Sequence, residues 1–190
     1  LPALLLRASA GLFGTSEFAL RLPSALAGAL TIPVIACLAA RFDRRALLPA
    51  ALLAALSPFL VWYSQETRHY ALAILGAALA HLAFLRLLEG PVGPRRVALY
   101  AASLWLGLMS NLTVIFLAAA HGLTLLGFRR ERWRPWLAAV APAFLLMLPW
   151  IWVAVTNNLN LRHVISVAPV PVAERLRGET TFSWLGVPYT

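Results

Sequence analysis

Long apolar segments alternate with short polar connections over most of the chain. The apolar segments lie at 21–41, 46–62, 70–88, 97–109, 112–128 and 136–155. A helix needs about 20 mostly apolar residues to cross the hydrocarbon core of a bilayer, and several of these segments approach that length. The pattern therefore predicts an all-α, polytopic membrane helical bundle with about six transmembrane helices.

Composition agrees with this prediction. Of the 190 residues, 61% are hydrophobic and 12% are charged, whereas soluble domains carry about a quarter charged residues. The net charge of +9 could indicate a nucleic-acid-binding protein. However, the basic residues form short clusters between apolar segments and do not follow one face. We therefore expect membrane lipids as partners, and no nucleic acid.

Arginine clusters in the connections predict the topology. The clusters are Arg41, Arg44 and Arg45; Arg86, Arg95 and Arg96; and Arg129, Arg130, Arg132 and Arg134. Because positively charged short loops face the cytoplasm, the three clusters should share that side, and the spans between them should come in pairs. Residues 97–128 must then turn back at their polar break, Ser110-Asn111. Each half would be only about 20–25 Å long, so the turn should lie below the membrane surface, within protein or a wet cavity.

The two ends of the chain differ from the middle. Residues 1–14 are too short to span and carry Arg7 among leucines, which fits an interfacial helix on the non-cytoplasmic face. The six-span bundle would cover 15–156, and the proline-rich and then charged residues 157–190 would begin a truncated outer loop, with a short amphipathic helix near 171–178. Because the chain starts with leucine and lacks a signal-peptide pattern, we interpret it as an internal part of a longer protein.

The most informative polar run is VWYSQETRHYAL at 61–72, between two apolar segments. One interpretation is a solvated turn beside aromatic residues of the membrane interface. The other is a functional site, because ionisable residues such as Glu66 and Arg68 are costly near hydrocarbon and commonly mark a pathway or a site.

Three motifs carry a resemblance to a known family. They are RLPSALAGAL at 21–30, LSPFLVWYSQETRHYAL at 56–72 and LMSNLTVIFLAAAHGL at 108–123. Their order and spacing resemble the family 39-like membrane glycosyltransferases, the superfamily of protein O-mannosyltransferases and aminoarabinose transferases. The resemblance covers about the first 130 residues, and it implies a GT-C fold with the site on the outer face of the membrane.

The resemblance also implies an activity. Such enzymes move a sugar from a polyprenyl-phosphate donor to a lipid, glycan or protein acceptor, and the donor is a substrate, so no cofactor is expected. The general base would be an acidic residue in an outer loop upstream of Leu1, so these residues alone would hold no catalytic residue and would be inactive. We expect a bacterial inner-membrane protein with the arginine-rich loops cytoplasmic and the Glu66/Arg68 loop periplasmic.

This chemistry suggests roles for four residues. The leaving group is a lipid phosphate, so a cation at membrane depth would stabilise the departing charge. Arg68 is the candidate, because guanidinium binds phosphate oxygens bidentately. Glu66 would orient Arg68 or bind sugar hydroxyls, and Tyr70 would stack on the sugar or donate a hydrogen bond. Arg21 either snorkels to the interface or faces the site.

Other polar residues carry weaker signals. Gln65, His69 and Asn111 are candidates for lining the cavity, although related sequences often show histidine at the position of Asn111. No cluster has metal-ligand spacing. His81 and His121 lie within apolar segments, where we expect ordinary interhelical hydrogen bonds.

Two other functions remain open from the sequence. A transporter or flippase would use Glu66 and Arg68 to line a substrate path, and a non-catalytic membrane subunit would keep the fold without the upstream acid. Transporters often contain inverted repeats and broken midplane helices. Here the charged residues lie at the ends of the apolar segments, which favours chemistry on a lipid-held substrate at the membrane surface.

Overall fold

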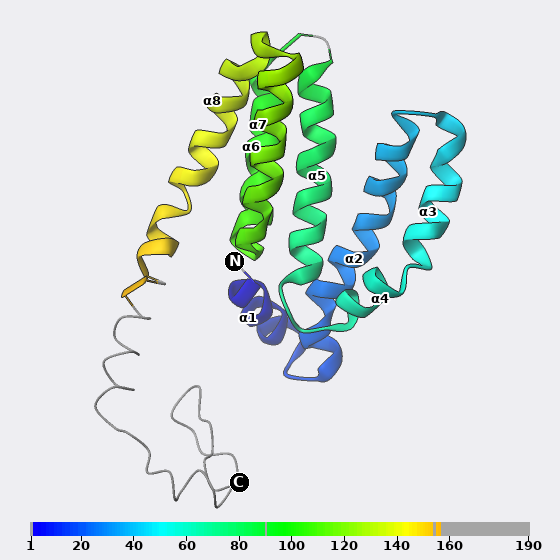
Figure 1. The fold of residues 1–190 in the computed structure, drawn as a ribbon. Helices are drawn as coiled ribbons and strands as arrows, with labels where there is room; N and C mark the ends of the chain where they lie inside the picture. The colour runs from blue at the N-terminus through cyan, green and yellow to red at the C-terminus, as the bar shows by residue number, and fades with distance from the viewer. Residues whose placement is uncertain (1, 90, 154, 157–190) are drawn as a thin grey trace, which may run out of the picture. The chain divides into compact units, whose positions relative to one another are not determined.

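A computed structural model describes residues 2–89, 91–153 and 155–156. Within these residues every regular element is a helix, and no strand occurs (Figure 1). The helices are α1 Pro2–Phe13, α2 Glu17–Ala40, η1 Arg44–Ala46, α3 Leu47–Ala55, α4 Pro58–Gln65, α5 Tyr70–Leu88, α6 Pro94–Ser110, η2 Leu112–Val114, α7 Ile115–Phe128, η3 Arg130–Arg132 and α8 Trp133–Leu145. All of them belong to one compact unit, Leu1–Leu148. The predicted outer loop at 157–190, with its helix near 171–178, lies outside the described residues.

Three helical stretches are long and apolar enough to cross a membrane: Glu17–Ala40, Tyr70–Leu88 and Arg130–Val153. They correspond to the predicted spans at 21–41, 70–88 and 136–155. The predicted all-helical membrane bundle is therefore confirmed. A helix also forms within the predicted interfacial segment 1–14, where Ser9 Oγ donates to the carbonyl of Ala19 in α2. The interfacial position of that helix stays a prediction.

The predicted span at 46–62 is not one straight helix. It divides into the stretches Arg44–Ala55 and Pro58–Gln65, which meet at a bend of 53°. Pro58 disfavours helical backbone at the residue before it, and Ser57 is extended, with φ −65° and ψ 116°. The Ser57 side chain then accepts a hydrogen bond from the amide of Leu60 and begins α4. If this bent pair is one span, the described residues hold four candidate spans.

The predicted reversal at Ser110-Asn111 is confirmed. α6 ends at Ser110, and Asn111 takes an extended backbone whose side chain caps η2 by accepting from the amide of Thr113 at 3.0 Å. Because α6 has 17 residues, and η2 with α7 spans Leu112–Phe128, each half is about 25 Å long at 1.5 Å per residue. Both are shorter than the three long spans, as expected.

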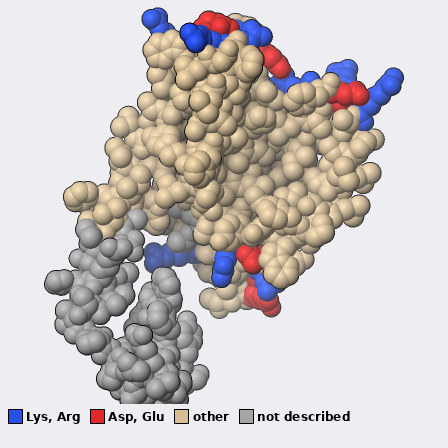
Figure 2. Space-filling view, in the orientation of Figure 1, with Lys and Arg blue, Asp and Glu red and all other residues tan. Residues whose placement is uncertain are grey.

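The three arginine clusters meet at one end of the bundle, as the sequence predicts. On the face that Figure 2 shows, charged side chains gather at two opposite ends, and the surface between them is uncharged. Arg41, after α2, forms an ion pair with Glu89, after α5. Arg132, before α8, donates to the carbonyl of Leu87 at 3.4 Å. These contacts tie the three connections together. We call this end the arginine-rich end and the opposite end, which holds residues 66–69, the outer end.

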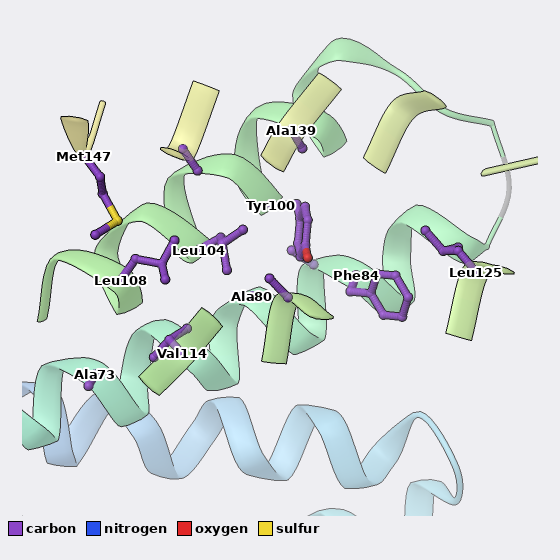
Figure 3. Packing of buried hydrophobic residues seen from close by; sticks show 13 residues of the cluster. Ala73, Ala80, Phe84, Tyr100, Leu104, Leu108, Val114, Leu125, Ala139 and Met147 are labelled. Atoms are coloured by element: carbon purple, nitrogen blue, oxygen red, sulfur yellow. The ribbon is translucent and has the colours of Figure 1, made fainter. Parts of the chain in front are cut away.

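Small residues allow close packing between helices. A Cβ atom on Gly76 of α5 would lie 2.5 Å from the amide nitrogen of Gly107 in α6, so the two backbones touch. A Cβ atom on Gly28 of α2 would lie 2.5 Å from Cβ of Ser64 in α4. Around the first contact, buried side chains of α5, α6, α7 and α8 form the main apolar core (Figure 3).

A chain of polar side chains crosses that core. Trp136 Nε1 donates to the Tyr100 hydroxyl at 3.1 Å, and the hydroxyl lies 2.9 Å from Nδ1 of His121. Nε2 of His121 lies 2.9 Å from Nδ1 of His81. The ring of Phe84 stacks on His121 with centroids 3.9 Å apart. The predicted interhelical hydrogen bonds of both histidines are therefore confirmed. If each group donates to the next, from Trp136 to His81, all four bond while neutral.

Replacing Gly76 with alanine should destabilise the bundle by about 1–3 kcal/mol, because the added methyl group meets backbone atoms that cannot rotate away. Gly127→Ala is the matched control, since a Cβ there meets nothing within 4 Å. The measurement is the free energy of unfolding in detergent. Equal stability of the two variants would contradict the proposed backbone contact.

Tyr100→Phe should cost about 1–3 kcal/mol of unfolding free energy, because it leaves Trp136 Nε1 and His121 Nδ1 without a partner. Trp136→Phe added to Tyr100→Phe removes one of these orphaned groups, so the double variant should lose less than the sum of the single losses. The free energy of unfolding is measured for Tyr100→Phe, for Trp136→Phe and for the double variant. If the loss in the double variant equals the sum of the two single losses, the polar chain does not act as a unit.

Candidate functional site

The predicted polar run forms a short connection that is fixed to α2. α4 ends at Gln65, Glu66 is extended with φ −81° and ψ 143°, and α5 begins at Tyr70. Ser24, buried on α2, donates its hydroxyl to the carbonyl of Arg68 at 3.1 Å. Residues 66–69 are thus held against the first turns of α2 by a specific hydrogen bond.

This arrangement encloses a polar cavity of about 340 Å³ at the outer end. Its lining residues are Glu17, Leu20, Arg21, Gln65, Glu66, Thr67 and Arg68. Four of the predicted site residues, Arg21, Gln65, Glu66 and Arg68, therefore line one cavity, although α3 and α4 separate Arg21 from the others along the chain. We call it the basic cavity after Arg21 and Arg68, although Glu17 and Glu66 bring an equal number of negative charges.

The charges of the basic cavity are only partly paired. Arg21 Nη2 lies 2.5 Å from a carboxylate oxygen of Glu17, one turn earlier on α2. Trp62 Nε1 donates to Oε1 of Glu66 at 3.0 Å, and Oε2 of Glu66 is buried without a partner among the described residues. The guanidinium of Arg68 is exposed, and no described residue pairs with it. Glu66 is therefore held by Trp62 and does not orient Arg68 in this structure, so Arg68 is available to an external anion.

A second cavity of about 310 Å³ lies on the other side of the connection, between α4, α5 and the turn at Asn111. Its lining residues are Phe59, Tyr63, Tyr70, Ala73, Ile74, Ala77, Asn111, Thr113, Val114 and Leu117. Aromatic rings follow one another along its edge. The ring centroids of Phe59 and Tyr63 are 4.7 Å apart, and those of Tyr63 and Tyr70 are 4.9 Å apart. The ring centroid of His69 lies 4.7 Å from that of Tyr70. We call it the aromatic cavity.

Asn111 contributes free hydrogen-bond donors to the aromatic cavity. Its Oδ1 accepts from the amide and the hydroxyl of Thr113, at 3.0 and 2.9 Å. Within the described part of the chain, the Asn111 amide NH₂ has no partner. The structure thus places two predicted residues, Tyr70 and Asn111, on one cavity, with the ring of His69 tilted at 39° to that of Tyr70.

An apolar groove of about 280 Å³ runs beside α2. Its lining residues are Leu5, Ser9, Phe13, Leu22, Pro23, Leu26, Ala27, Leu30, Leu72 and Leu75, from α1, α2 and α5. Ser9 is occupied by its bond to Ala19, so the groove presents hydrocarbon almost throughout. Arg21 lines the basic cavity and Leu22 lines the groove, which makes the two neighbours along α2.

Glu17, Phe59 and Tyr63 also line these cavities and were not predicted as site residues from the sequence. The spacing of residues in the sequence could have indicated each of them. Glu17 lies four residues before Arg21, and Phe59 lies four residues before Tyr63, and side chains at this spacing are neighbours on a helix. Among the residues that the structure describes, no three His, Cys, Asp or Glu side chains group together in a way that could hold a metal ion.

Residues 1–153 match the dolichyl-phosphate-mannose-protein mannosyltransferase family. The chain belongs to this family. The predicted GT-C membrane glycosyltransferase is therefore confirmed at the level of the family, and the general class of the protein is a membrane glycosyltransferase. No curated protein and no solved structure matches the chain.

Replacing Ser24 with alanine should loosen residues 66–69. The loss of one hydrogen bond, worth about 0.5–1.5 kcal/mol, should raise amide hydrogen exchange in this connection up to about tenfold. Ser103→Ala is the control, because among the described residues the Ser103 hydroxyl bonds to the carbonyl of Leu99 in its own helix alone. Unchanged exchange at 66–69 in the Ser24 variant would mean that other contacts hold the connection.

Proposed function

We propose that the outer end of this bundle binds a polyprenyl-phosphate sugar and presents the sugar for transfer to an acceptor hydroxyl. The observation that carries the proposal is the position of Arg68, with which no described residue pairs, in a cavity lined also by Arg21, the neighbour in sequence of Leu22 in the apolar groove. A lipid phosphate is complementary to both: its anionic group matches the arginine, and its long hydrocarbon chain matches the groove.

The phosphate would lie in the basic cavity. When the bond between the anomeric carbon of the sugar and the phosphate oxygen breaks, the phosphate leaves with additional negative charge. Arg68 can stabilise that charge with two parallel N–H···O bonds. Arg21 can add a second cation if its contact with Glu17 opens, because both of these side chains are largely exposed.

The prenyl chain would follow the apolar groove between α1, α2 and α5. Burying hydrocarbon in a groove of leucine and phenylalanine removes apolar surface from water and head groups. Arg21 lines the basic cavity and Leu22, the next residue of α2, lines the groove, so the prenyl chain of a phosphate bound near Arg21 would pass around α2 into the groove.

The sugar would lie toward the aromatic cavity. Ligand sites commonly combine apolar walls with a few polar groups that fix orientation, and here Tyr70 offers a ring and a hydroxyl while Asn111 offers a free amide. The acceptor hydroxyl attacks the anomeric carbon as the phosphate departs, and its proton goes to a carboxylate base. Following the family resemblance, we place that base upstream of Leu1 and assign no base among the described residues.

The orientation follows from charge. Positive loops favour the cytoplasmic side, so we infer that the arginine-rich end faces the cytoplasm and the outer end faces the periplasm of a bacterial inner membrane. The donor would then be used on the outer face, and the acceptor would be a lipid, a glycan or a protein at that face.

The test is Arg68→Lys in the full-length protein, with transfer from a defined polyprenyl-phosphate sugar followed by mass spectrometry. Lysine keeps the charge and loses the bidentate geometry. Charge-assisted hydrogen bonds contribute about 1.5–3 kcal/mol, so kcat/KM should fall about 10- to 100-fold. For Arg68→Gln, kcat/KM should fall further.

Arg7→Lys is the matched control. Arg7 is also exposed but lines none of the three cavities at the outer end. If Arg68→Lys and Arg68→Gln both transfer sugar as fast as the wild type, Arg68 does not bind the phosphate. If Arg7→Lys is impaired as strongly, the effect comes from losing any guanidinium group at this end and is not specific to Arg68.

A further inference from the structure

A cavity of about 500 Å³ lies at the arginine-rich end, far from the proposed transfer site. Its lining residues are Cys37, Ala40, Arg41, Arg44, Leu47, Leu82 and Arg86. They come from α2, η1, α3 and α5, so the cavity lies between helices and is not a patch on one loop. The proposed transfer of sugar at the outer end uses none of these residues.

Two of its three arginines are unpaired. Arg41 is neutralised by its ion pair with Glu89. Arg44 and Arg86 make no hydrogen bond or ion pair through their guanidinium groups with any described residue. Two unpartnered cations that border one cavity repel each other, and an anion between them would relieve that repulsion. The cavity therefore suits a ligand with at least one negative charge.

The rest of the lining is apolar, with the side chains of Ala40, Leu47 and Leu82. α2 ends at Ala40 and α5 ends at Leu88, so the arginines lie where the apolar spans end and the leucines lie on the membrane side of that boundary. A fully hydrated anion would gain nothing from such a wall. A ligand with an anionic head and a hydrocarbon tail would match both parts.

The cavity itself lies between α2 and α5. The two helices pack closely in the outer half of the bundle, where Ala27 lies in one buried cluster with Leu72 and Leu75. Toward the arginine-rich end they diverge (Figure 1). Cys37 and Ala40 of α2 and Leu82 of α5 line the cavity there, so a chain that enters it lies between α2 and α5.

We propose that this cavity binds one anionic phospholipid, with its phosphate between Arg44 and Arg86 and its acyl chains between α2 and α5. Basic pockets between membrane helices on the cytoplasmic side are suited to lipid phosphates, and guanidinium groups bind phosphate oxygens in a fixed geometry. The bound lipid fills the cavity between the α2–α3 hairpin and α5. It thereby acts as a packing element at the arginine-rich end.

Cys37 provides a probe inside the cavity. It is the single cysteine of this chain, it is exposed, and it lines the cavity. The experiment measures the rate at which a small maleimide modifies Cys37 in the purified full-length protein, with any other cysteine replaced. The detergent solution contains added phosphatidylglycerol, added phosphatidylcholine or inorganic phosphate. Phosphatidylglycerol should slow modification at least about fivefold, and the other two should not.

Matched variants separate the cavity from the general charge of this end. Arg44→Gln/Arg86→Gln should weaken the protection about 30-fold in lipid concentration, since each basic residue near an anionic lipid contributes about a fivefold factor. Arg95→Gln/Arg134→Gln removes the same charge from residues at the same end that do not line the cavity, and it should keep the protection. Arg41 is left intact in both, so the ion pair with Glu89 remains.

Three results would overturn the proposal. Absence of protection by phosphatidylglycerol in the wild type would mean that no anionic lipid occupies the cavity. Equal protection by inorganic phosphate would assign the site to a free anion. Equal loss of protection in the two double variants would mean that the lipid gathers around the charged surface and does not enter the cavity. Thermal unfolding without added lipid confirms that both variants are folded.

Discussion

The contact between the backbones of Gly76 and Gly107 sets the arrangement of the bundle. Because neither residue has a side chain, α5 and α6 approach more closely than any other residue pair would allow. Gly107 also contacts Val114, the last residue of η2, at 3.0 Å from the position of its missing Cβ. The reversal at Asn111 is therefore fixed relative to α5, and it forms a wall of the aromatic cavity beside Tyr70. The close approach of Gly76 and Gly107 thus positions Tyr70 and Asn111 relative to each other.

Two contacts of α2 position the residues of the basic cavity. Ser24 and Gly28 lie one turn apart on α2, and they meet the carbonyl of Arg68 and the side chain of Ser64. The break before Pro58 is what lets α4 turn across α2 at this point. Without the bend, residues 58–65 would continue away from α2, and Arg68 could not share a cavity with Arg21. The proline therefore matters to the site although it has no polar group to offer.

Charged and neutral polar groups occupy different parts of the bundle. The charged side chains lie at the two ends, where water and head groups solvate them, and the interior contains the neutral chain of Trp136, Tyr100, His121 and His81. Each member of that chain has a partner on another helix, so it joins α5, α6, α7 and α8 without an uncompensated charge in hydrocarbon. At each end, arginines without a partner among the described residues line a cavity. The proposed ligands, a polyprenyl phosphate at the outer end and an anionic phospholipid at the other, would supply the missing negative charge.

The class of fold, the reversal at Ser110-Asn111, the common end of the arginine clusters and the family could all be predicted from the sequence. These follow from hydropathy, charge and motif order, which are properties of consecutive residues. Which side chains share a cavity depends on the tertiary structure. Packing between elements that are far apart in the sequence brings Arg21 to Arg68, Tyr70 to Asn111, and Arg44 to Arg86. A shift of one residue turns a side chain by about 100°, and only the close contacts at Gly28, Gly76 and Gly107 select one rotation from the many that an apolar segment permits.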